Sequence, residues 1–332
     1  MTDAPILEVR DLTKVFDAGM GLIGRALARL GLAKRRAGVR AVDGVSFTMR
    51  RGEVLGVVGE SGCGKSTLGR MVAGLTQPTT GEIVHDGRPD RGAGLDRQMI
   101  FQDPFSSLNP RKRLGELIAE APRVHRVVGP DELTAYVEAL MERCGVDPAF
   151  RERFAHQFSG GQRQRVGIAR ALAVKPDLIV CDEAVSALDV SIQAQIVNLF
   201  MDLRDELDLT YLFISHDLGV VRYVSDRVIV MYLGRVVESG PAEALFDAPN
   251  HPYTRALIEG VPRLDRRRMT YAPIEGDIPS PLDPPPGCHF HPRCPFAMDR
   301  CRVEAPALRD LGGDRRSACH LNDKPTQLLK EA

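Results

Sequence analysis

The sequence predicts an α/β fold, and three apolar runs that each end in polar residues are the observations behind this prediction. Val54–Val58 runs into the glycine-rich turn Gly59–Gly64, which opens a helix at about Leu68–Ala73. Leu178–Cys181 ends in two carboxylates, and Leu212–Ser215 ends at a histidine. Short runs that are apolar throughout are typical of buried strands. With 332 residues, the chain is long enough for one large α/β domain and an appendage.

Composition excludes several broad classes of protein. The chain has 44 basic and 44 acidic residues, so its net charge does not favour general binding of nucleic acid. Its longest apolar runs, such as Val228–Leu233, are far too short to span a bilayer. Residues Met1–Pro5 lack the basic and apolar segments of a signal peptide. We therefore expect a cytosolic chain whose cysteines are reduced unless a metal holds them.

The first glycine-rich turn predicts a phosphate-binding loop, because it follows a strand and opens a helix. Glycines let backbone N–H groups point at phosphate oxygens, and the helix N-terminus adds a partial positive charge. Lys65 is expected to reach the β- and γ-phosphates, and the Ser66 hydroxyl is expected to hold Mg²⁺. The chain is therefore predicted to bind ATP or GTP. The expected nucleotide-binding residues here are Gly59, Ser61, Gly62, Cys63, Gly64, Lys65, Ser66 and Thr67.

The two carboxylates that follow the second apolar run indicate which reaction the nucleotide undergoes. Asp182 is placed to bind the Mg²⁺ shell, through water, as in other phosphate-loop enzymes. Glu183 is placed one position further, where it can polarise an attacking water. A kinase has no need of this second carboxylate. The pair therefore predicts hydrolysis.

A second anion site is indicated between these two strands. Ser159 can cap a helix that runs through Ala173, and Gly160 and Gly161 leave room for a phosphate at the helix N-terminus. The chain has only one phosphate loop for this second site to serve. We therefore expect the second site to act on a nucleotide held by another subunit.

Taken together and in this order, these motifs resemble those of ABC-type ATPases. Ser159–Gln162 is similar to the signature motif of that family. Gln102 resembles its Q-loop glutamine, Asp189 its D-loop aspartate and His216 its switch histidine. The resemblance covers about Ile6–Gly240.

The resemblance implies an ABC-type P-loop NTPase core with an antiparallel β subdomain and a helical subdomain at about 103–173. It also implies ATP and Mg²⁺ as ligands. The residues implied around Mg²⁺ are Ser66, Gln102 and Asp182, those implied in catalysis are Glu183, His216 and Gln102, and those implied to act on the ATP of a partner are Ser159, Gly160, Gly161 and Gln162.

An aromatic residue stacks on adenine in this family, and its place in the chain is the end of the first strand. Phe16 lies there, after Leu7–Leu12, and is expected either to stack on adenine or to pack in the core. The insertion Asp17–Arg40 follows it. Apolar residues from Leu22 to Leu30 share one helical face of this basic insertion, which predicts either a helix lying on anionic lipid or a solvated excursion.

The insertion together with Arg40–Phe47 resembles the second ATPase subunit of oligopeptide and dipeptide importers more than the first. Three further stretches resemble the ATPases of these importers. They are Phe101–Arg111, His251–Leu257 and the proline-rich Pro281–Cys288. The implied domains are a nucleotide-binding domain at 6–250 and a C-terminal extension at 251–332. The implied partners are a paralogous ATPase subunit or a second copy, two transmembrane permease subunits and an extracytoplasmic solute-binding protein. The implied location is the cytoplasmic face of the inner membrane, as a peripheral protein.

Other functions remain open at this point. The family resemblance also covers soluble ABC ATPases of DNA repair or translation, although these usually carry paired domains, coiled coils or basic surfaces. Nickel chelates, glutathione and other small solutes are alternatives to peptides.

Four cysteines are clustered behind the proline-rich stretch, namely Cys288, Cys294, Cys301 and Cys319. In a cytosolic chain such a cluster favours a metal over disulfides. The spacing lacks the paired Cys-x2-Cys of zinc ribbons, and four thiolates suit a [4Fe–4S] cluster, which the family resemblance also implies. Zinc, with His289, His291 or His320 as substitute ligands, and no metal at all remain alternatives.

Overall fold

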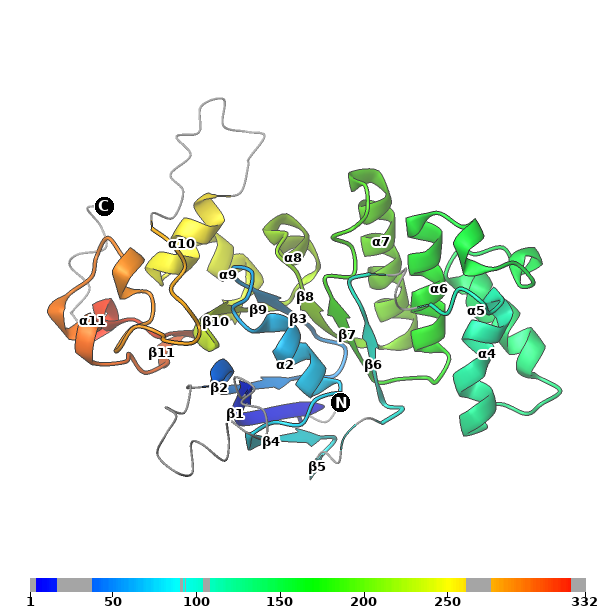
Figure 1. Cartoon of the computed structure of the whole chain (residues 1–332), viewed down its shortest axis with the longest axis horizontal. Coiled ribbons are helices and arrows are strands. Elements are labelled where there is room, and N and C mark those ends of the chain that lie inside the picture. Colours follow the sequence, from blue (N-terminus) through cyan, green and yellow to red (C-terminus); the bar gives the residue numbers. More distant parts are fainter. Residues whose placement is uncertain are drawn as a thin grey trace, which may run out of the picture.

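The computed structural model describes residues 4–16, 38–89, 92, 94–103, 108–260 and 276–323. An eight-stranded sheet runs through the molecule, in the order β11-β12-β10-β9-β3-β8-β7-β6 (Figure 1). Five of its strands, β9, β3, β8, β7 and the edge strand β6, are parallel. In this order, their bounds are Arg227–Tyr232, Val54–Val58, Thr210–Ile214, Leu178–Asp182 and Arg97–Ile100. The α/β prediction and its three apolar runs are confirmed.

The register of the parallel strands decides which residues meet. Ile214 of β8 lies opposite both Val57 of β3 and Asp182 of β7, and Ile100 of β6 lies opposite Cys181. All these strands end at the same edge of the sheet. The chain segments that follow them therefore leave the sheet side by side, and these are the segments with the expected site residues.

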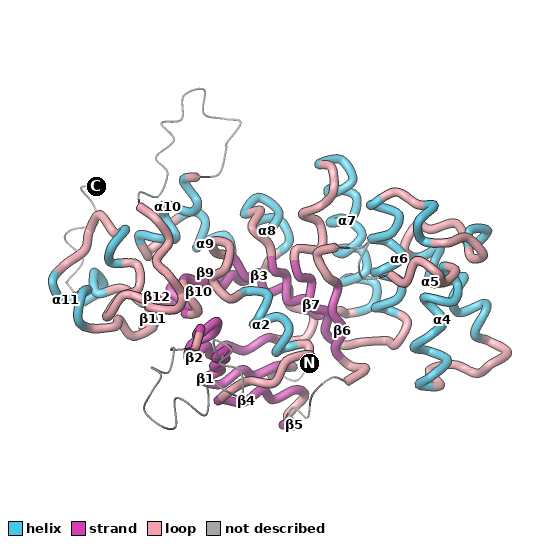
Figure 2. The backbone as a smooth tube through the Cα atoms, viewed as in Figure 1, coloured by secondary structure: helices cyan, strands magenta, loops and turns pink. Residues whose placement is uncertain are grey.

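A second, antiparallel sheet lies below the first, in the order β2-β1-β4-β5 (Figure 2). Helix α2 (Lys65–Val72) lies between the two sheets, and its Leu68 and Met71 pack with residues of both in one apolar core. The bounds of the four strands are Val39–Met49 for β2, Leu7–Phe16 for β1, Thr80–His85 for β4 and Arg88–Pro89 for β5. This is the antiparallel β subdomain that the resemblance implied.

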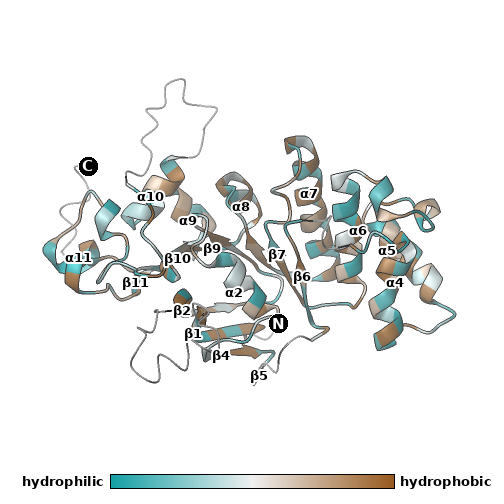
Figure 3. Cartoon of the chain, in the orientation of Figure 1, coloured by the Kyte–Doolittle hydropathy of each residue, from teal (hydrophilic) through white to brown (hydrophobic). Residues whose placement is uncertain are grey.

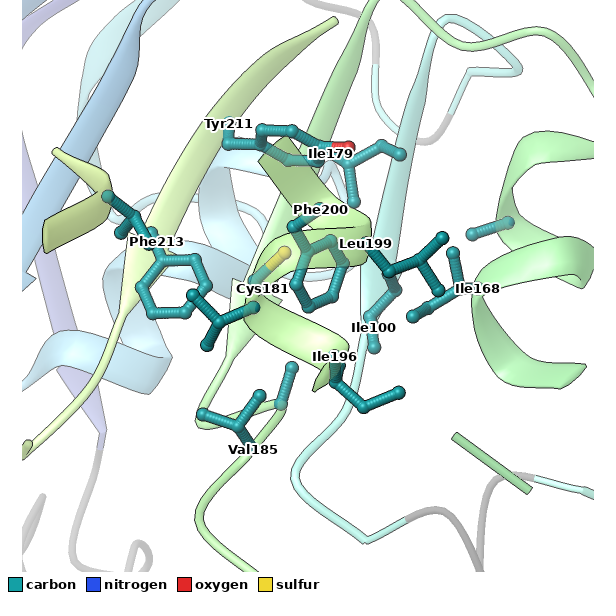
Figure 4. Packing of buried hydrophobic residues seen from close by; sticks show 14 of the residues in the cluster. Ile100, Ile168, Ile179, Cys181, Val185, Ile196, Leu199, Phe200, Tyr211 and Phe213 are labelled. Atoms are coloured by element: carbon teal, nitrogen blue, oxygen red, sulfur yellow. The ribbon is translucent and has the colours of Figure 1, made fainter. Parts of the chain in front are cut away.

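Helices cover the other face of the main sheet. The rings of Tyr211 and Phe213 pack edge to face against the ring of Phe200 there (Figure 4). The ring centroids lie 5.6 Å apart for Phe200 and Tyr211 and 6.1 Å apart for Phe200 and Phe213. The central strands are hydrophobic along their length, as burial on both faces requires (Figure 3). These helices are α6 (Gly160–Leu172), α7 (Val190–Leu207) and α8 (Leu218–Val224). Helices α4 (Leu114–His125) and α5 (Leu133–Arg143) pack with α6 beyond β6 (Figure 1), with short 3-10 turns η1 (Pro148–Phe150) and η2 (Ala155–Gln157).

The C-terminal part joins the main sheet, which the sequence reasoning did not predict. Strand β12 (Arg315–Ser317) pairs with β10 (Arg235–Pro241), so that Glu238 lies opposite Ser317. The aromatic ring of Phe290 packs against those of Tyr232 and Tyr253. The remaining elements are α9 (Ala242–Asp247), α10 (Pro252–Glu259), η3 (His291–Arg293), α11 (Asp299–Val303), β11 (Arg309–Gly312) and η4 (His320–Asp323).

Most of the basic insertion, residues 17–37, lies outside the described residues, so its predicted amphipathic helix is not tested. The boundary of the insertion needs a correction, because Val39 and Arg40 belong to β2. Across the part of the chain that the structure describes, none of the helices combines the length and the apolar character needed to cross a bilayer.

Candidate nucleotide-binding and hydrolysis site

The glycine-rich turn between β3 and α2 has a backbone that only glycine accommodates. Gly59 and Gly64 have φ angles of 150° and 108°. A Cβ atom at Gly64 would lie 2.0 Å from the carbonyl oxygen of Ala41, and one at Gly59 would lie 2.2 Å from that of Met231. The turn is therefore pressed against β2 and β9, which fixes its shape.

Lys65, the first residue of α2, is buried at this turn. Its Nζ donates to the carbonyl oxygens of Gly59 and Glu60, over 2.8 and 3.1 Å, and lies 3.8 Å from the Cys63 thiol. A buried ammonium with these neutral acceptors lacks the compensation that an anion would give. Together with the N-terminus of α2, the lysine forms a cradle that suits phosphate oxygens.

The carboxylate of Asp182, at the end of β7, lies next to the first turn of α2. The hydroxyl of Ser66 donates to Asp182 Oδ1 over 2.8 Å. Burial raises the pKa of Asp182, and this hydrogen bond from Ser66 opposes the rise. A hydroxyl and a carboxylate in contact are the ligand types that Mg²⁺ uses beside a nucleotide.

The predicted side chains of Gln102 and His216 both lie next to the carboxylate of Glu183. The amide Nε2 of Gln102 donates to Glu183 Oε2 over 2.8 Å, and His216 Nδ1 lies 3.3 Å from the same oxygen. Glu183 has a φ angle of 50°, a region that side-chain-bearing residues seldom adopt. Its carbonyl oxygen accepts from both the backbone N–H and the hydroxyl of Ser186, which holds this conformation.

Gln102 and Glu183 line a cavity of about 330 Å³, whereas Asp182 and His216 are not among its lining residues. The predicted residues among its lining are Ser61, Gly62, Gly64, Lys65, Ser66, Thr67, Gln102 and Glu183. Of the other predicted loop residues, Cys63 is buried beneath the loop. Val39, Arg40, Ala41, Leu233, Gly234 and Pro281 also line the cavity, and sequence reasoning did not select them. They come from strands and loops distant in the sequence, so a local motif could not identify them.

Phe16 lies at the end of β1 and is 46% exposed. It pairs with Val39, which lines the cavity, and directly opposed residues of an antiparallel pair share a face. The Lys14 ammonium lies 5.4 Å from the centre of its ring. This exposure excludes the core-packing alternative, whereas its contact with adenine remains a prediction.

The second predicted anion site lies at the start of α6. The Ser159 hydroxyl accepts from the backbone N–H of Gln162, and the Gln162 side chain accepts from the N–H of Ser159, which forms a capping box. Asp189 stands at the N-cap of α7 without a side-chain capping bond. The signature residues do not line the cavity beside Lys65.

The four clustered cysteines line one small cavity of about 10 Å³. His251, His291 and His320 also line it, whereas His289 faces a separate cavity beside Arg235. His251 was missed as a neighbour of the cysteines, because it precedes them by 37 or more positions. Burial raises the pKa of Cys294 to about 11 and that of Cys319 to about 12.

The cysteine cavity passes one test for a metal and fails another. Its donor set suits iron or zinc, but the space holds at most one water molecule. Within the described ranges, no group of three or more histidine, cysteine, aspartate or glutamate residues is arranged to hold a metal ion. The predicted [4Fe–4S] cluster, its zinc alternative and a metal-holding cysteine extension therefore gain no support from this arrangement.

Comparison with known proteins identifies the family. Residues 42–186 match the ABC transporter family, and residues 237–301 match the C-terminal region of oligopeptide/dipeptide transporters. AppF of Bacillus subtilis strain 168, an oligopeptide transport ATP-binding protein, is 48% identical over 329 residues, which cover 95% of this chain and 97% of that protein. DppF of Pseudomonas aeruginosa strain UCBPP-PA14, a di/tripeptide transport ATP-binding protein, is 46% identical over 325 residues, covering 95% and 97%.

A solved structure shows the same architecture. The ATP-binding cassette MJ0796, in a dimeric post-hydrolysis state bound to ADP and phosphate, matches with a TM-score of 0.59 and 25% identity, over 71% of this chain and 98% of that one. The sequence-based recognition is thus confirmed: the chain belongs to the ATP-binding subunits of ABC importers of the oligopeptide and dipeptide type, and it is an ATPase of that family.

Proposed function

We propose that this chain binds and hydrolyses ATP to drive the import of dipeptides or longer peptides through a membrane complex. The observation that carries this proposal is the meeting of Lys65, Asp182 and Glu183 at one edge of the sheet, beside a cavity of about 330 Å³. The names of the relatives AppF and DppF support peptides as the solute. The match of residues 237–301 to a transporter C-terminal region disfavours DNA repair or translation.

The hydrolysis step follows from the groups around the cavity. Lys65 exchanges its carbonyl partners for β- and γ-phosphate oxygens, and Ser66, Asp182 and Gln102 would hold the Mg²⁺ that accompanies ATP. Glu183 accepts a proton from the attacking water while the oxygen of that water forms a bond to the γ-phosphorus. The bond to the bridging oxygen of ADP breaks, which releases phosphate. We assign His216, whose Nδ1 lies 3.3 Å from Glu183 Oε2, to a hydrogen bond with the γ-phosphate, as the family resemblance implies.

We assign Ser159, Gly160, Gly161 and Gln162 to the ATP of a second ATPase subunit. The capped N-terminus of α6 offers N–H groups to an anion, yet these residues do not line the cavity beside Lys65. A head-to-tail dimer places this helix against the partner's γ-phosphate, and Asp189 then lies between the two sites. The dimeric state of MJ0796 supports a dimer. A paralogue, giving a heterodimer, is the proposed partner.

The rest of the complex follows from the family. We assign the nucleotide-binding domain to 6–250 and the C-terminal extension to 251–332. Two permease subunits hold this chain at the cytoplasmic face of the inner membrane as a peripheral protein, and a solute-binding protein delivers the peptide to them. We also propose that Cys288, Cys294, Cys301 and Cys319 take up a [4Fe–4S] cluster once the thiols move apart, because they share one cavity.

The experiment that tests this function uses the complete complex in proteoliposomes. ATP hydrolysis that is stimulated by the binding protein loaded with a peptide, together with uptake of labelled peptide, is the expected result. Lys65→Ala should lose ATP binding and with it both activities. If a nickel chelate or glutathione stimulates hydrolysis and no peptide does, that compound would replace peptides as the proposed solute. A chain that fails to copurify with permease subunits would contradict the importer assignment.

A further inference from the structure

Glu60, the second residue of the phosphate loop, is held by an arginine that lies 233 positions further along the chain. Arg293 donates from Nη1 to Glu60 Oε2 over 2.7 Å and from Nη2 to Glu60 Oε1 over 2.9 Å. The Arg293 side chain is only 4% exposed, and that of Glu60 is 21% exposed. This is a two-bond ion pair of defined geometry, which fixes the carboxylate in one direction.

A second residue of the C-terminal extension holds the backbone of Glu60. The Glu60 N–H donates to the hydroxyl of Tyr253 over 2.8 Å. Tyr253 is fully buried, and its ring lies 4.7 Å from that of Tyr232 and 5.3 Å from that of Phe290. The hydroxyl therefore has little freedom to follow a movement of the loop.

The position of Glu60 reaches the nucleotide site directly. Its carbonyl oxygen accepts from Lys65 Nζ, over 3.1 Å, and from the backbone N–H of Cys63, over 3.3 Å. A free carboxylate in this loop would also repel the phosphates of ATP. Arg293 compensates that charge, so one side chain of the extension both orients the loop and removes the repulsion.

We propose that Arg293 and Tyr253 are positioning residues for the phosphate loop, through which the C-terminal extension sets the affinity of the chain for ATP. The inference deepens the proposed function and rests on ATP binding at Lys65. It gives the extension a role in the nucleotide site, although Pro281 is the only residue of the extension's described ranges, 251–260 and 276–323, that lines the cavity.

The same contacts link the nucleotide site to the cysteines. Arg293 ends the turn η3, which lies between Cys288 and Cys294, and the backbone N–H of Arg293 donates to Phe290. Coupling between two sites is reciprocal. ATP binding should therefore protect the backbone amides of residues 291–294 from hydrogen exchange.

The test compares two arginines of the same extension in the full-length chain. Arg300 pairs with Glu304 and Asp323, and among the described residues it forms no ion pair with the phosphate loop. Arg293→Ala should weaken MgATP binding about tenfold, the loss of a charge-assisted pair, whereas Arg300→Ala should leave it unchanged. In the assembled complex, Arg293→Ala should raise KM for ATP with kcat at saturating ATP within about twofold.

A double variant separates positioning from a general loss of stability. Because Glu60 is left as an uncompensated charge in Arg293→Ala, adding Glu60→Gln should restore MgATP affinity to within about threefold of wild type. A general loss of stability would instead make the double variant weaker than either single one. The defect of Arg293→Ala should also shrink as salt rises, since salt screens the exposed carboxylate.

Tyr253→Phe is the second measurement, and it serves where Arg293→Ala does not fold. This variant removes one oxygen atom, leaves the Glu60 N–H without its acceptor, and should weaken MgATP binding about tenfold and abolish the amide protection at 291–294. Equal affinity for MgATP in wild type, Arg293→Ala and Tyr253→Phe would overturn this inference and leave the proposed function intact. A wild-type chain that does not bind MgATP would instead overturn the proposed function.

Discussion

The side-chain amide of Gln102 donates to Glu183 Oε2 over 2.8 Å, which joins the segment after β6 to the carboxylate after β7. The two residues are 81 positions apart in the sequence and meet because their strands are parallel neighbours in the sheet. His216, after β8, reaches the same oxygen from the other side at 3.3 Å. One carboxylate is therefore held between the two side chains expected to sense the γ-phosphate.

Replacing this carboxylate should separate ATP binding from hydrolysis. We expect Glu183→Gln to bind MgATP normally and to lose about 10²–10⁴-fold in the rate of hydrolysis, because an amide cannot accept the proton of water. The amide oxygen can still accept from Gln102, so the site should keep its shape. The measurement is phosphate release by the purified complex, with nucleotide binding measured in parallel. Near-normal turnover would show that Glu183 is not the base.

The signature motif should act on the nucleotide of the other subunit. A Cβ at Gly160 meets only Leu188, at 3.5 Å, so Gly160→Asp should fold and place a negative charge at the N-terminus of α6. In a dimer with one variant chain, we expect vanadate trapping to be lost at the phosphate loop of the wild-type partner. ATP binding at Lys65 of the variant chain should persist.

Gly167 of the same helix provides a matched control, because a Cβ there meets nothing within 4 Å. Gly167→Asp adds the same charge away from the helix N-terminus and should leave trapping at both sites. Loss of trapping only at the variant chain's own loop would contradict the head-to-tail arrangement.

The sequence was sufficient to predict the residues of the nucleotide site that follow apolar strands. It was not sufficient to predict the distant residues that hold them in position. Gly59–Gly64, Asp182 and His216 each follow a short apolar strand, and such a pattern can be read within about ten residues. The ion pair between Glu60 and Arg293 cannot be read in this way, because nothing near either residue marks its partner. It depends on how the C-terminal extension folds back onto the sheet.

The same limit explains two other features that the sequence did not predict. The pairing of β12 with β10 adds the extension to the main sheet, yet Arg315–Ser317 is too short and too polar to predict a strand. From the sequence, His251 was identified only as part of the stretch His251–Leu257, which resembles the ATPases of peptide importers. Its burial beside the cysteines follows from the packing of its ring against Phe290, which the sequence does not reveal.

Burial of His251 should make the stability of the chain depend on pH. Burial lowers the pKa of His251 to about 4 from an ordinary value of 6.5. The unfolded chain therefore binds the proton first, so the contribution of His251 to stability is complete above about pH 6.5 and is lost as the pH falls towards 4. The difference corresponds to about 3 kcal/mol. Chemical denaturation at several pH values measures it.

An asparagine at the same position should remove most of this dependence. Nδ1 of His251 accepts from the backbone N–H of Tyr253 and caps α10, a bond that the asparagine oxygen can replace. His251→Asn should therefore make the stability profile less steep between pH 6.5 and 4, while His85 and His289, whose pKa values burial also lowers, keep their contributions. His156 is exposed, so His156→Asn should leave the profile as in the wild type. An unchanged profile in His251→Asn would refute the neutral buried histidine.

The last prediction concerns the four cysteines at 288, 294, 301 and 319. If they take up a [4Fe–4S] cluster, protein purified without oxygen should be brown, with about four irons per chain and broad absorbance near about 400 nm. Burial raises the pKa of Cys294 to about 11, and a thiol must lose its proton to bind iron. Reconstitution should therefore be more complete at pH 8.5 than at pH 6.5.

Two cysteine variants make this test specific. Cys294→Ser should lose the iron and its absorbance, whereas Cys144→Ala, at a buried thiol of the nucleotide-binding domain, should keep both. Because Arg293 adjoins Cys294 and holds Glu60, loss of the metal should also weaken MgATP binding in Cys294→Ser. Stoichiometric zinc without iron would identify a zinc site. Absence of both metals from anaerobic protein would leave the cysteines as unmetallated thiols of the extension.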